Sequence, residues 1–554
     1  MEQWRLVLAI AISILIFIAW DLMFVERREV QPPSRVPATI EELQDTPRAV
    51  MPDTTPAIES IDPPMETEGI PGRRFGTITV QTPLYTAQIS EKGAALTSFI
   101  LETYREAVEE DSPKKQMIPH ENQWGTALIE LPEERTPQMA GAVYTTSVDE
   151  DRVVVTGTHQ TVTFFTRTAS NILIEKKFTF FPDSYKINIG VLLNNRSGQP
   201  LERGLEVLLA NPAPDGKGGF SFEGPFAHID GALEQIKMGD IAKKSLLTGD
   251  VAWAGMTDRY FMTAVVPESP GDSGVRLSHN QAKNLVEVRI VQPSMIMMPD
   301  GIQPYSFCLF LGPKRIPDLA QCGGSLEKAV DFGFFDIIAK PCLWLMNQIY
   351  DRAIPNYGVA IILLTMLIKL IFWPLGSKSY KSMAEMKKLQ PLMTDIRKKY
   401  KDDKKKMNEE VMNLYRTYKV NPMSGCLPML VQIPVFIAFY RMLYESIELR
   451  HAPFWLWIND LSAPDRLFQF DITIPLMHPP FGIPVLTIIM GATMFLQQKL
   501  SPPPGDPTQA RIMMMMPIIF TFIFINFPSG LVLYWLVNNV LSIAQQYYIT
   551  KKLA

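Results

Sequence analysis

Apolar runs near the two ends of the chain constrain its fold more than any other sequence feature. One run occupies residues 6–20 and is extended by residues 22–25. Five more lie in the C-terminal part, at residues 357–373, 427–444, 484–500, 512–526 and 529–549. A helix needs about 20 mostly apolar residues to cross a hydrocarbon core of about 30 Å. We therefore predict a polytopic α-helical membrane protein with six transmembrane helices and a large water-exposed region between the first two.

The first apolar run predicts a retained membrane anchor. A cleaved signal peptide ends at a small-residue cleavage site, whereas this run continues into DLMFVERREV. Residues 1–25 are therefore predicted to form a transmembrane signal anchor. Residues 26–72 are rich in Pro, Glu and Thr. Because that composition buries little apolar surface, we expect a disordered linker there.

Residues 73–322 have the sequence texture of a β domain. Short runs of β-branched and aromatic residues, such as residues 77–80 and 161–166, alternate with Gly, Pro, Asn and Asp. The sequence KFTFFPDSYKINIGVLL at residues 177–193 predicts a β-hairpin. We predict a large antiparallel β-sandwich. A carbohydrate-binding or mutarotase-like site is compatible with such a sandwich, but no acid and His cluster together in the sequence, so no catalytic role is expected.

Residues 323–350 predict an amphipathic helix. Lys328, Lys340 and two Asp residues interrupt its apolar side chains. This pattern is typical of a helix that lies in the membrane interface, and equally of a helix packed on the β domain. The remaining residues, 351–554, are predicted to form a five-helix core.

The distribution of charge predicts the orientation of the spans. Residues 376–420 contain 13 Lys or Arg against 6 Asp or Glu, whereas residues 445–480 contain five acids and two Arg. Positively charged loops stay on the cytoplasmic side of a membrane. We therefore expect both chain termini to be cytoplasmic, and residues 445–480 and the β domain to lie outside.

Residues 377–420 predict a cytoplasmic helical hairpin. Two stretches with apolar residues at spacings of three and four flank the polar sequence KDDKKK; the first stretch holds Met386, Leu389, Met393, Ile396 and Tyr400, and the second holds Met407, Val411, Leu414 and Tyr418. Pro391 is expected to kink the first helix or start it afresh. The hairpin either only fixes the topology or docks an anionic partner, such as ribosomal RNA or acidic lipid.

Lys369 is the most informative polar residue of the predicted spans. A cation inside a span needs water, a partner or the interface. Lys369 lies five residues before Pro374, so one interpretation is a side chain that reaches the headgroups. The other is a functional charge, because Thr365, Lys369 and Trp373 share one helix face. Amides in or near other spans, at Gln432, Gln498, Asn538 and Asn539, suggest a shared polar cavity on the cytoplasmic side.

Several classes of function find no support in the sequence. It contains no HExxH, GxxxxGK[ST] or GxSxG motif and no zinc-type Cys spacing, so neither an enzyme nor a cofactor is expected. The later five spans carry no Asp or Glu, which argues against an ion-coupled transporter. Cys308 and Cys322 are expected outside the cytoplasm, where they could be oxidised, but we expect unpaired buried thiols.

Several sequence blocks resemble the YidC/Oxa/Alb family of membrane protein insertases. They are VNPMSGCLPMLVQIPVFIAFYRML, ELRHAPFWLWINDLSAPD, MFLQQKLSP and NFPSGLVLYWLVNN. The order of anchor, β domain, interfacial helix, core and basic hairpin is similar to the Gram-negative form, which has a large periplasmic domain. The resemblance implies an insertase and chaperone of the bacterial inner membrane, which works alone or with the Sec translocon through a hydrophilic groove open to the cytoplasm and to lipid.

The resemblance also implies roles for individual residues. The groove charge corresponds to Lys369, where many Gram-negative members have Arg; the positive charge is kept, but the bidentate geometry is lost. Thr365, Tyr534 and Trp535 correspond to substrate-contacting positions. Gln432, Gln498 and Asn538 are expected to supply polar groups to the groove. The hairpin and residues 501–510 correspond to regions that contact the ribosome and targeting factor.

The mechanism that follows requires no nucleotide. The acidic tail of a nascent membrane protein enters the groove and is attracted by Lys369. Its apolar segment slides past the third and fifth spans, where Met513, Met514, Met515 and Met516 adapt to varied sequences, and then enters the phospholipid bilayer. Two rival hypotheses are a secondary transporter and a carbohydrate-binding envelope protein whose membrane part is only an anchor.

Overall fold

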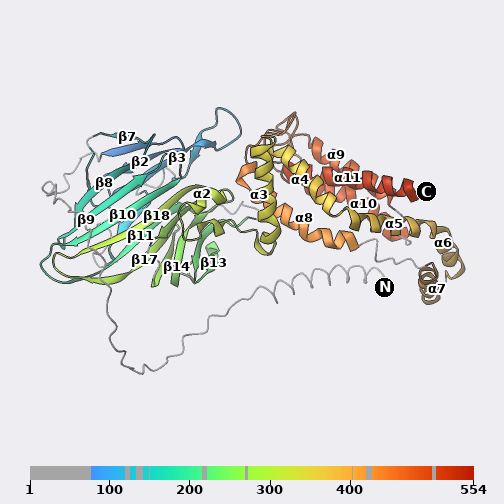
Figure 1. Ribbon diagram of the computed structural model, residues 1–554, viewed down its shortest axis with the longest axis horizontal. Coiled ribbons are helices and arrows are strands. Elements are labelled where there is room, and N and C mark those ends of the chain that lie inside the picture. The colour runs from blue at the N-terminus through green and yellow to red at the C-terminus, as the bar shows by residue number, and fades with distance from the viewer. Residues whose placement is uncertain are drawn as a thin grey trace, which may run out of the picture. The chain divides into compact units, whose positions relative to one another are not determined.

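A computed structural model of the chain describes residues 76–118, 125–132, 141–148, 150–214, 221–268, 272–401, 403–418, 427–501 and 507–553. The predicted signal anchor and linker, at residues 1–25 and 26–72, lie outside this set. Strands occupy the first part of the described chain and helices occupy the second part (Figure 1).

The smaller of two sheets has five strands in the order β4-β3-β2-β1-β7. Their bounds are β1 (Thr77–Gln81), β2 (Tyr85–Ser90), β3 (Ala95–Arg105), β4 (Lys114–Gln116) and β7 (Arg152–Val154). Strand β1 pairs in parallel with β7, and the other neighbours in this sheet are antiparallel. The sheet therefore departs from the prediction of purely antiparallel strands at this one pair.

The larger sheet has 13 strands, 11 of which follow the order β5-β11-β17-β16-β14-β15-β18-β10-β9-β8-β6. The bounds are β5 (Leu128–Glu130), β6 (Thr145–Thr146), β8 (Gln160–Arg167), β9 (Ile172–Phe180), β10 (Lys186–Asn195), β11 (Leu201–Pro212), β12 (Gly224–Ile229), β13 (Ala232–Gln235), β14 (Leu246–Thr257), β15 (Phe261–Pro267), β16 (Asp272–Asn280), β17 (Leu285–Met297) and β18 (Ile302–Pro313). Strand β12 pairs with β13 and β14 beside this path. The predicted β-rich domain is confirmed.

The hairpin of β9 and β10 shows how the sequence specifies the sheet. Successive residues of β10 alternate between half-buried and buried, because side chains of a strand point to opposite faces. Ile187 pairs with Phe180 and Ile189 with Phe178, so large apolar side chains meet across the strands. This hairpin is the one predicted from KFTFFPDSYKINIGVLL.

Lys176 on β9 is enclosed in the β domain. Its ammonium donates hydrogen bonds to the carbonyl oxygens of Ala94, at 2.7 Å, and Ala127, at 2.6 Å. Both alanines have positive φ, 43° and 57°, so the lysine partners two carbonyls that precede β3 and β5 at tight turns. A buried charge or polar group is costly unless it is hydrogen-bonded in this way.

A disulfide joins Cys308 on β18 to Cys322. The expectation of unpaired thiols at these positions is therefore wrong. After β18, the short helix α2 (Ile316–Ala320) brings the chain back, and the two Cα atoms lie 5.7 Å apart, within the range that a disulfide requires. The sequence separation of 14 residues does not by itself indicate that the chain reverses direction after β18.

The segment between the β domain and the helices begins with two short 3₁₀ turns, η3 (Leu326–Ala329) and η4 (Gly333–Phe335). The helix α3 (Asp336–Arg352) follows and contacts α4 and α8. It buries Leu343 and Met346 while Ile337 and Trp344 are exposed. Both faces of this helix are therefore partly apolar.

Among the described residues, eight further α-helices form the C-terminal part. Their bounds are α4 (Tyr357–Ile371), α5 (Trp373–Lys388), α6 (Gln390–Lys399), α7 (Lys404–Thr417), α8 (Leu427–Glu445), α9 (Val485–Leu500), α10 (Pro507–Phe524) and α11 (Ser529–Leu553). Helices α4, α8, α9, α10 and α11 coincide closely with the five apolar runs. Helix α11 contacts α4, α5, α8 and α9, which places it at the centre of this part.

By length and hydropathy alone, none of the described helices suffices for a bilayer crossing by itself. Helices α4 and α5 together meet that criterion, with a bend of 65° between them, and α9 and the Ala510–Phe524 part of α10 are shorter apolar helices.

Helices α6 and α7 lie against each other in the basic region. Helix α6 starts afresh at Gln390 with Pro391 in its first turn, as expected from the missing amide hydrogen of proline. The side chain of Asp403 caps α7 by accepting a hydrogen bond from the amide of Lys406. The Tyr415 hydroxyl lies 3.4 Å from the sulfur of Met393, so α7 contacts the predicted apolar stripe of α6 through a residue outside its own predicted stripe.

Candidate functional site

The candidate site centres on the ammonium group of Lys369, near the end of α4. It donates to the hydroxyl of Ser542, at 2.7 Å, and to the side-chain oxygen of Asn538, at 3.3 Å. Both acceptors lie on α11, one helical turn apart. The ammonium is thus bound to a neighbouring helix by side-chain oxygens.

Asn538 links three helices at this point. Its side-chain oxygen also accepts a hydrogen bond from Gln432 of α8, at 3.1 Å. A carbonyl oxygen has two lone pairs, and here Lys369 and Gln432 occupy both. The Ser542 hydroxyl in turn donates to the backbone carbonyl of Asn538, at 2.7 Å. The sequence-predicted residues Lys369, Gln432 and Asn538 are therefore brought together.

The polar row continues along α11 toward its C-terminus. The Gln545 side chain donates to the carbonyl oxygen of Trp373, at 3.0 Å, and to the Ser377 hydroxyl, at 3.3 Å. Gly376 lies beside it, and a Cβ added there would be 3.0 Å from the Gln545 amide nitrogen. The bend between α4 and α5 is thus held against α11 by an amide.

Ser542 and Gln545 were missed by sequence reasoning. A signal was available, because positions 538, 542 and 545 are spaced by four and three and share one helix face. They were overlooked because a single hydroxyl or amide within a helix is not distinctive in the sequence.

An aromatic wall borders the polar row. Tyr534 is buried, with its ring stacked 4.9 Å from Phe439. Trp535 packs edge-on against Phe436, with centroids 4.9 Å apart. The indole nitrogen of Trp535 is buried and has no hydrogen-bond partner among the described residues, so a donor is left for a ligand.

Thr365 and Gln498 lie apart from this hydrogen-bond network. Thr365 is one turn before Lys369 and is buried, and its hydroxyl donates to the carbonyl oxygen of Ile361. Gln498 lies in the last turn of α9 and is half-buried. Within the described part of the chain, its side chain makes no hydrogen bond to Lys369, Gln432 or Asn538.

Apolar side chains surround the polar row on the outside of the helices. Met366, Leu367 and Leu370 of α4 are exposed, and so are Met514 and Met515 of α10. Exposed apolar patches of this kind mark interaction with a membrane or another protein. The site therefore combines a polar interior with an apolar exterior.

A cavity lies on the β domain. A cavity of about 600 Å³ is lined by residues that include Glu106, Lys115, Asn211, Asp258 and Phe261, and no His is among its lining residues. Among the described residues that line it, no acid–His pair is present.

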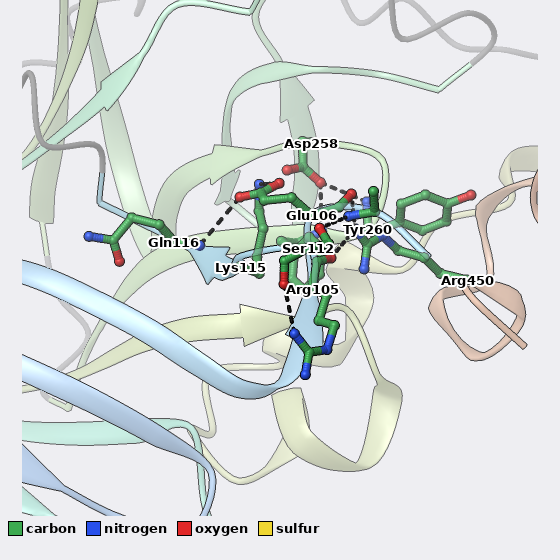
Figure 2. A network of polar contacts seen from close by, with 10 residues as sticks. Arg105, Glu106, Ser112, Lys115, Gln116, Asp258, Tyr260 and Arg450 are labelled. Atoms are coloured by element: carbon green, nitrogen blue, oxygen red, sulfur yellow. Dashed lines mark hydrogen bonds and ion pairs between the residues drawn. The ribbon is translucent and has the colours of Figure 1, made fainter. Parts of the chain in front are cut away.

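A polar network borders this cavity (Figure 2). Arg450, which follows the 3₁₀ turn η6 (Ile447–Leu449), donates to the carbonyl oxygens of Arg105, at 2.6 Å, and Glu106, at 3.1 Å. Lys115 and Glu106 form an ion pair at 3.2 Å. The contacts of Arg450 link the chain after α8 to the end of β3.

Two family models match the chain. Residues 77–345 match the model described as the YidC periplasmic domain, and residues 349–554 match the model described as the 60Kd inner membrane protein. The two matches meet close to the start of the helical part.

Curated relatives match almost the whole chain. The membrane protein insertase YidC of Syntrophobacter fumaroxidans is 39% identical over 566 residues, covering 99% of this chain and 99% of that protein. The protein of the same name from Pelobacter propionicus is 39% identical with the same coverage of both chains. A crystal structure of an active YidC insertase shares 19% identity and covers 86% of this chain and 93% of its own, with a TM-score of 0.37.

Proposed function

Because the chain belongs to the YidC family of membrane protein insertases, we propose that it inserts nascent membrane proteins into the inner membrane through the polar row around Lys369. The family consists of inner-membrane proteins with a periplasmic domain, and they are insertases rather than enzymes. The observation that carries the proposal is the enclosed ammonium held by Asn538 and Ser542.

We propose six spans with both termini in the cytoplasm. The first is residues 1–25, and α4, α8, α9, α10 and α11 supply the others. The excess of Lys and Arg at residues 376–420 favours a cytoplasmic position for α6 and α7. The segment between α8 and α9 then lies on the periplasmic side with the β domain.

Lys369 acts as a single-point anion receptor in this proposal. A lysine ammonium has three donor hydrogens, and Asn538 and Ser542 accept two of them. One hydrogen remains for one carboxylate oxygen of an entering acidic tail. An arginine at this position would instead offer a planar fork to both oxygens.

The neighbouring side chains receive the rest of the substrate. Thr365, Tyr534 and Trp535 contact the entering segment, and the free indole hydrogen of Trp535 pairs with a substrate carbonyl. The side-chain amides of Gln432, Gln498 and Asn538 supply polar groups to the acidic tail. The exposed methionines of α10 are unbranched and adapt to varied apolar sequences.

Substrate release is driven by burial of apolar surface in lipid, so no cofactor enters the cycle. The ribosome and targeting factor dock on α6, α7 and residues 501–510. Sec translocon components cooperate with the insertase for larger substrates. The basic hairpin provides positive charge for anionic partners of this kind.

The test uses purified full-length protein in sealed liposomes. A ribosome-free, single-span substrate with a short acidic tail is added, and protection of the tail from external protease is scored. Wild type and Lys369→Arg are expected to insert the substrate. Lys369→Ala and Lys369→Glu are expected to lower the yield roughly tenfold, equivalent to about 1.4 kcal/mol, because the attraction for the carboxylate is lost.

A matched control separates the groove charge from total charge. Lys551→Ala removes one exposed lysine at the end of α11 and is expected to leave insertion unchanged. Equal insertion by all Lys369 variants would contradict the role of the charge. No insertion above empty liposomes would contradict autonomous insertion altogether.

A further inference from the structure

The segment between α8 and α9 carries large apolar side chains on its surface. Leu456, Phe468, Ile472 and Leu476 are 86%, 73%, 72% and 77% exposed, and Trp455 is 60% exposed. Side chains of this size are normally covered in a water-soluble loop. Their exposure therefore needs a partner surface.

Three of these residues also adopt an unfavourable backbone conformation. Leu456, Phe468 and Leu476 have φ angles of 58°, 51° and 67°. This left-handed region suits Gly and Asn, whereas bulky side chains rarely adopt it. Exposure of a leucine or phenylalanine side chain to water provides no stabilisation that would offset this backbone strain. The strain therefore points to a role for the side chains themselves.

The segment is held rigidly by two buried charged residues. Asp465 accepts hydrogen bonds from the Trp457 indole and from the amide of Leu486 at the start of α9. Arg466 donates to the carbonyl oxygens of Pro480, at 2.9 Å, and Ile525, at 2.8 Å. These bonds fix the segment to the ends of α9 and α10.

Asn526 adds a second attachment. It donates to the carbonyl oxygen of Leu476, at 2.7 Å, and accepts from the amide of His478, at 2.8 Å. Leu467 and Ile483 exchange both of their backbone hydrogen bonds, at 2.9 and 2.8 Å. The exposed side chains are thus presented by a rigid support.

The surface around these side chains has little charge. Between residues 452 and 485 the Asp, Glu, Lys and Arg residues are Asp460, Asp465, Arg466 and Asp471, and the interval also contains His478. Asp465 and Arg466 are buried, and Asp460 accepts hydrogen bonds from His451 and Ser462. Asp471 remains as the one exposed acid in this interval.

The apolar surface also continues onto the helices. Ile483 at the end of the segment is exposed, and so are Ile488 and Ile489 in the first turns of α9 and Ile523 near the end of α10. In the proposed function these helix surfaces face lipid. A surface that carries one exposed acid beside Trp and Leu side chains, and that is continuous with a lipid-facing surface, fits the interfacial layer of a membrane.

We propose that residues 452–485 form a rigid wedge whose exposed apolar side chains insert into the outer leaflet of the membrane. The wedge fixes the depth of the periplasmic ends of α9 and α10, to which it is hydrogen-bonded. This inference rests on the proposed transmembrane placement of those helices. Its partner is lipid, and no other protein is required.

The test places an environment-sensitive fluorophore at single cysteines. Leu456→Cys, Phe468→Cys and Leu476→Cys are made in full-length protein that carries Cys342→Ala and Cys426→Ala and keeps the Cys308–Cys322 disulfide. Each is reconstituted in vesicles of phosphatidylethanolamine and phosphatidylglycerol. Lys243→Cys, on a lysine whose side chain is 81% exposed on the β domain, serves as the water-exposed control.

Lipids with a nitroxide near the top of the acyl chain are expected to quench the three wedge labels by roughly twofold or more, and to leave the Lys243 label unaffected. Iodide in the water phase is expected to quench the Lys243 label alone. Wedge labels quenched by iodide like the control would overturn the proposal. Labels shielded from both quenchers would also overturn it, because a protein surface would then cover the segment.

A second variant separates insertion in lipid from a purely structural role. Asn tolerates positive φ, so Leu456→Asn with Leu476→Asn is expected to keep the thermal midpoint while a fluorophore at Phe468→Cys loses nitroxide quenching. A large drop in the midpoint would show that the two leucines stabilise the fold instead.

Substrate insertion is scored in the same vesicles. If substrate is inserted but the wedge labels are exposed to water, the wedge proposal alone is overturned. If the wedge labels are quenched by lipid but no substrate is inserted, the proposed function alone is overturned.

Discussion

At the scale of single residues, the buried Lys176 and the half-buried Lys369 are hydrogen-bonded in different ways. Lys369 is hydrogen-bonded to side-chain oxygens of another helix. Lys176 is hydrogen-bonded to backbone carbonyls at two tight turns. Side-chain acceptors can be reoriented when a substrate arrives, whereas backbone carbonyls are fixed by the fold. This difference suits Lys369 to binding and Lys176 to structure.

Lys176 predicts a distinct pH dependence of stability. Burial lowers the pKa of Lys176 from 10.5 to about 7. Between these values the unfolded chain binds a proton that the folded chain does not, so the free energy of unfolding rises with pH over this window. The expected slope from this group is on the order of 1.4 kcal/mol per pH unit.

The measurement compares thermal midpoints of wild type and Lys176→Met at pH 6.5, 8 and 9.5. Met fills a similar volume but does not titrate and leaves two carbonyls unpaired, so it is expected to be less stable by about 1–3 kcal/mol per carbonyl. The wild-type advantage should grow as pH rises. A constant difference across the three pH values would exclude a lysine with a lowered pKa.

At the scale of elements, helices and strands were easier to predict than the bonds between them. The apolar runs located α4, α8, α9, α10 and α11 closely, because a helix whose side chains are mostly apolar leaves a continuous signal in the sequence. The β9–β10 hairpin was predicted for a similar local reason. The bend after Ile371 was not predicted, because it depends on the distant Gln545 side chain that binds the carbonyl of Trp373.

The candidate site was predictable only in part for the same physical reason. Lys369, Gln432 and Asn538 stand out as polar residues in apolar runs, so sequence reasoning found them. Ser542 contributes the shorter bond to Lys369, but a single hydroxyl within a helix carries no distinctive pattern. The exposed leucines with positive φ likewise look like ordinary apolar residues until the backbone conformation is known.

The contact between α4 and the segment after α8 yields a prediction at this scale. A Cβ added at Gly358 would overlap the ring of Phe454, and the Phe454 carbonyl accepts a hydrogen bond from Asn356 at 3.3 Å. Gly358→Ala is therefore expected to lower the free energy of unfolding by about 1–3 kcal/mol through overpacking. Thermal unfolding of the purified full-length protein measures the effect.

Gly157 provides the matched control. A Cβ added there meets nothing within 4 Å, so Gly157→Ala is expected to be neutral or slightly stabilising, because it restricts the unfolded chain. If Gly358→Ala proved as stable as Gly157→Ala, the close packing of Phe454 on α4 would be contradicted.

At the scale of the whole molecule, the chain combines a β domain with a helical part, and the helical part exposes many large apolar side chains. The contacts of Arg450 with the end of β3 connect the two. The Cys308–Cys322 disulfide belongs to the β domain. Disulfides persist in oxidising compartments and are rare in the cytosol, so this bond agrees with the periplasmic position of the domain in the family.

The disulfide therefore allows stability and location to be tested together. Cross-linking residues separated by 14 positions is expected to stabilise the β domain by about 3 kcal/mol. The Cys322→Ser variant should therefore have a lower thermal midpoint than the oxidised wild type and the same midpoint as the reduced wild type. In intact cells, a membrane-impermeant thiol reagent should label Cys308 and Cys322 only after an external reductant is added. Labelling without a reductant would mean free thiols in the folded chain and would contradict the disulfide.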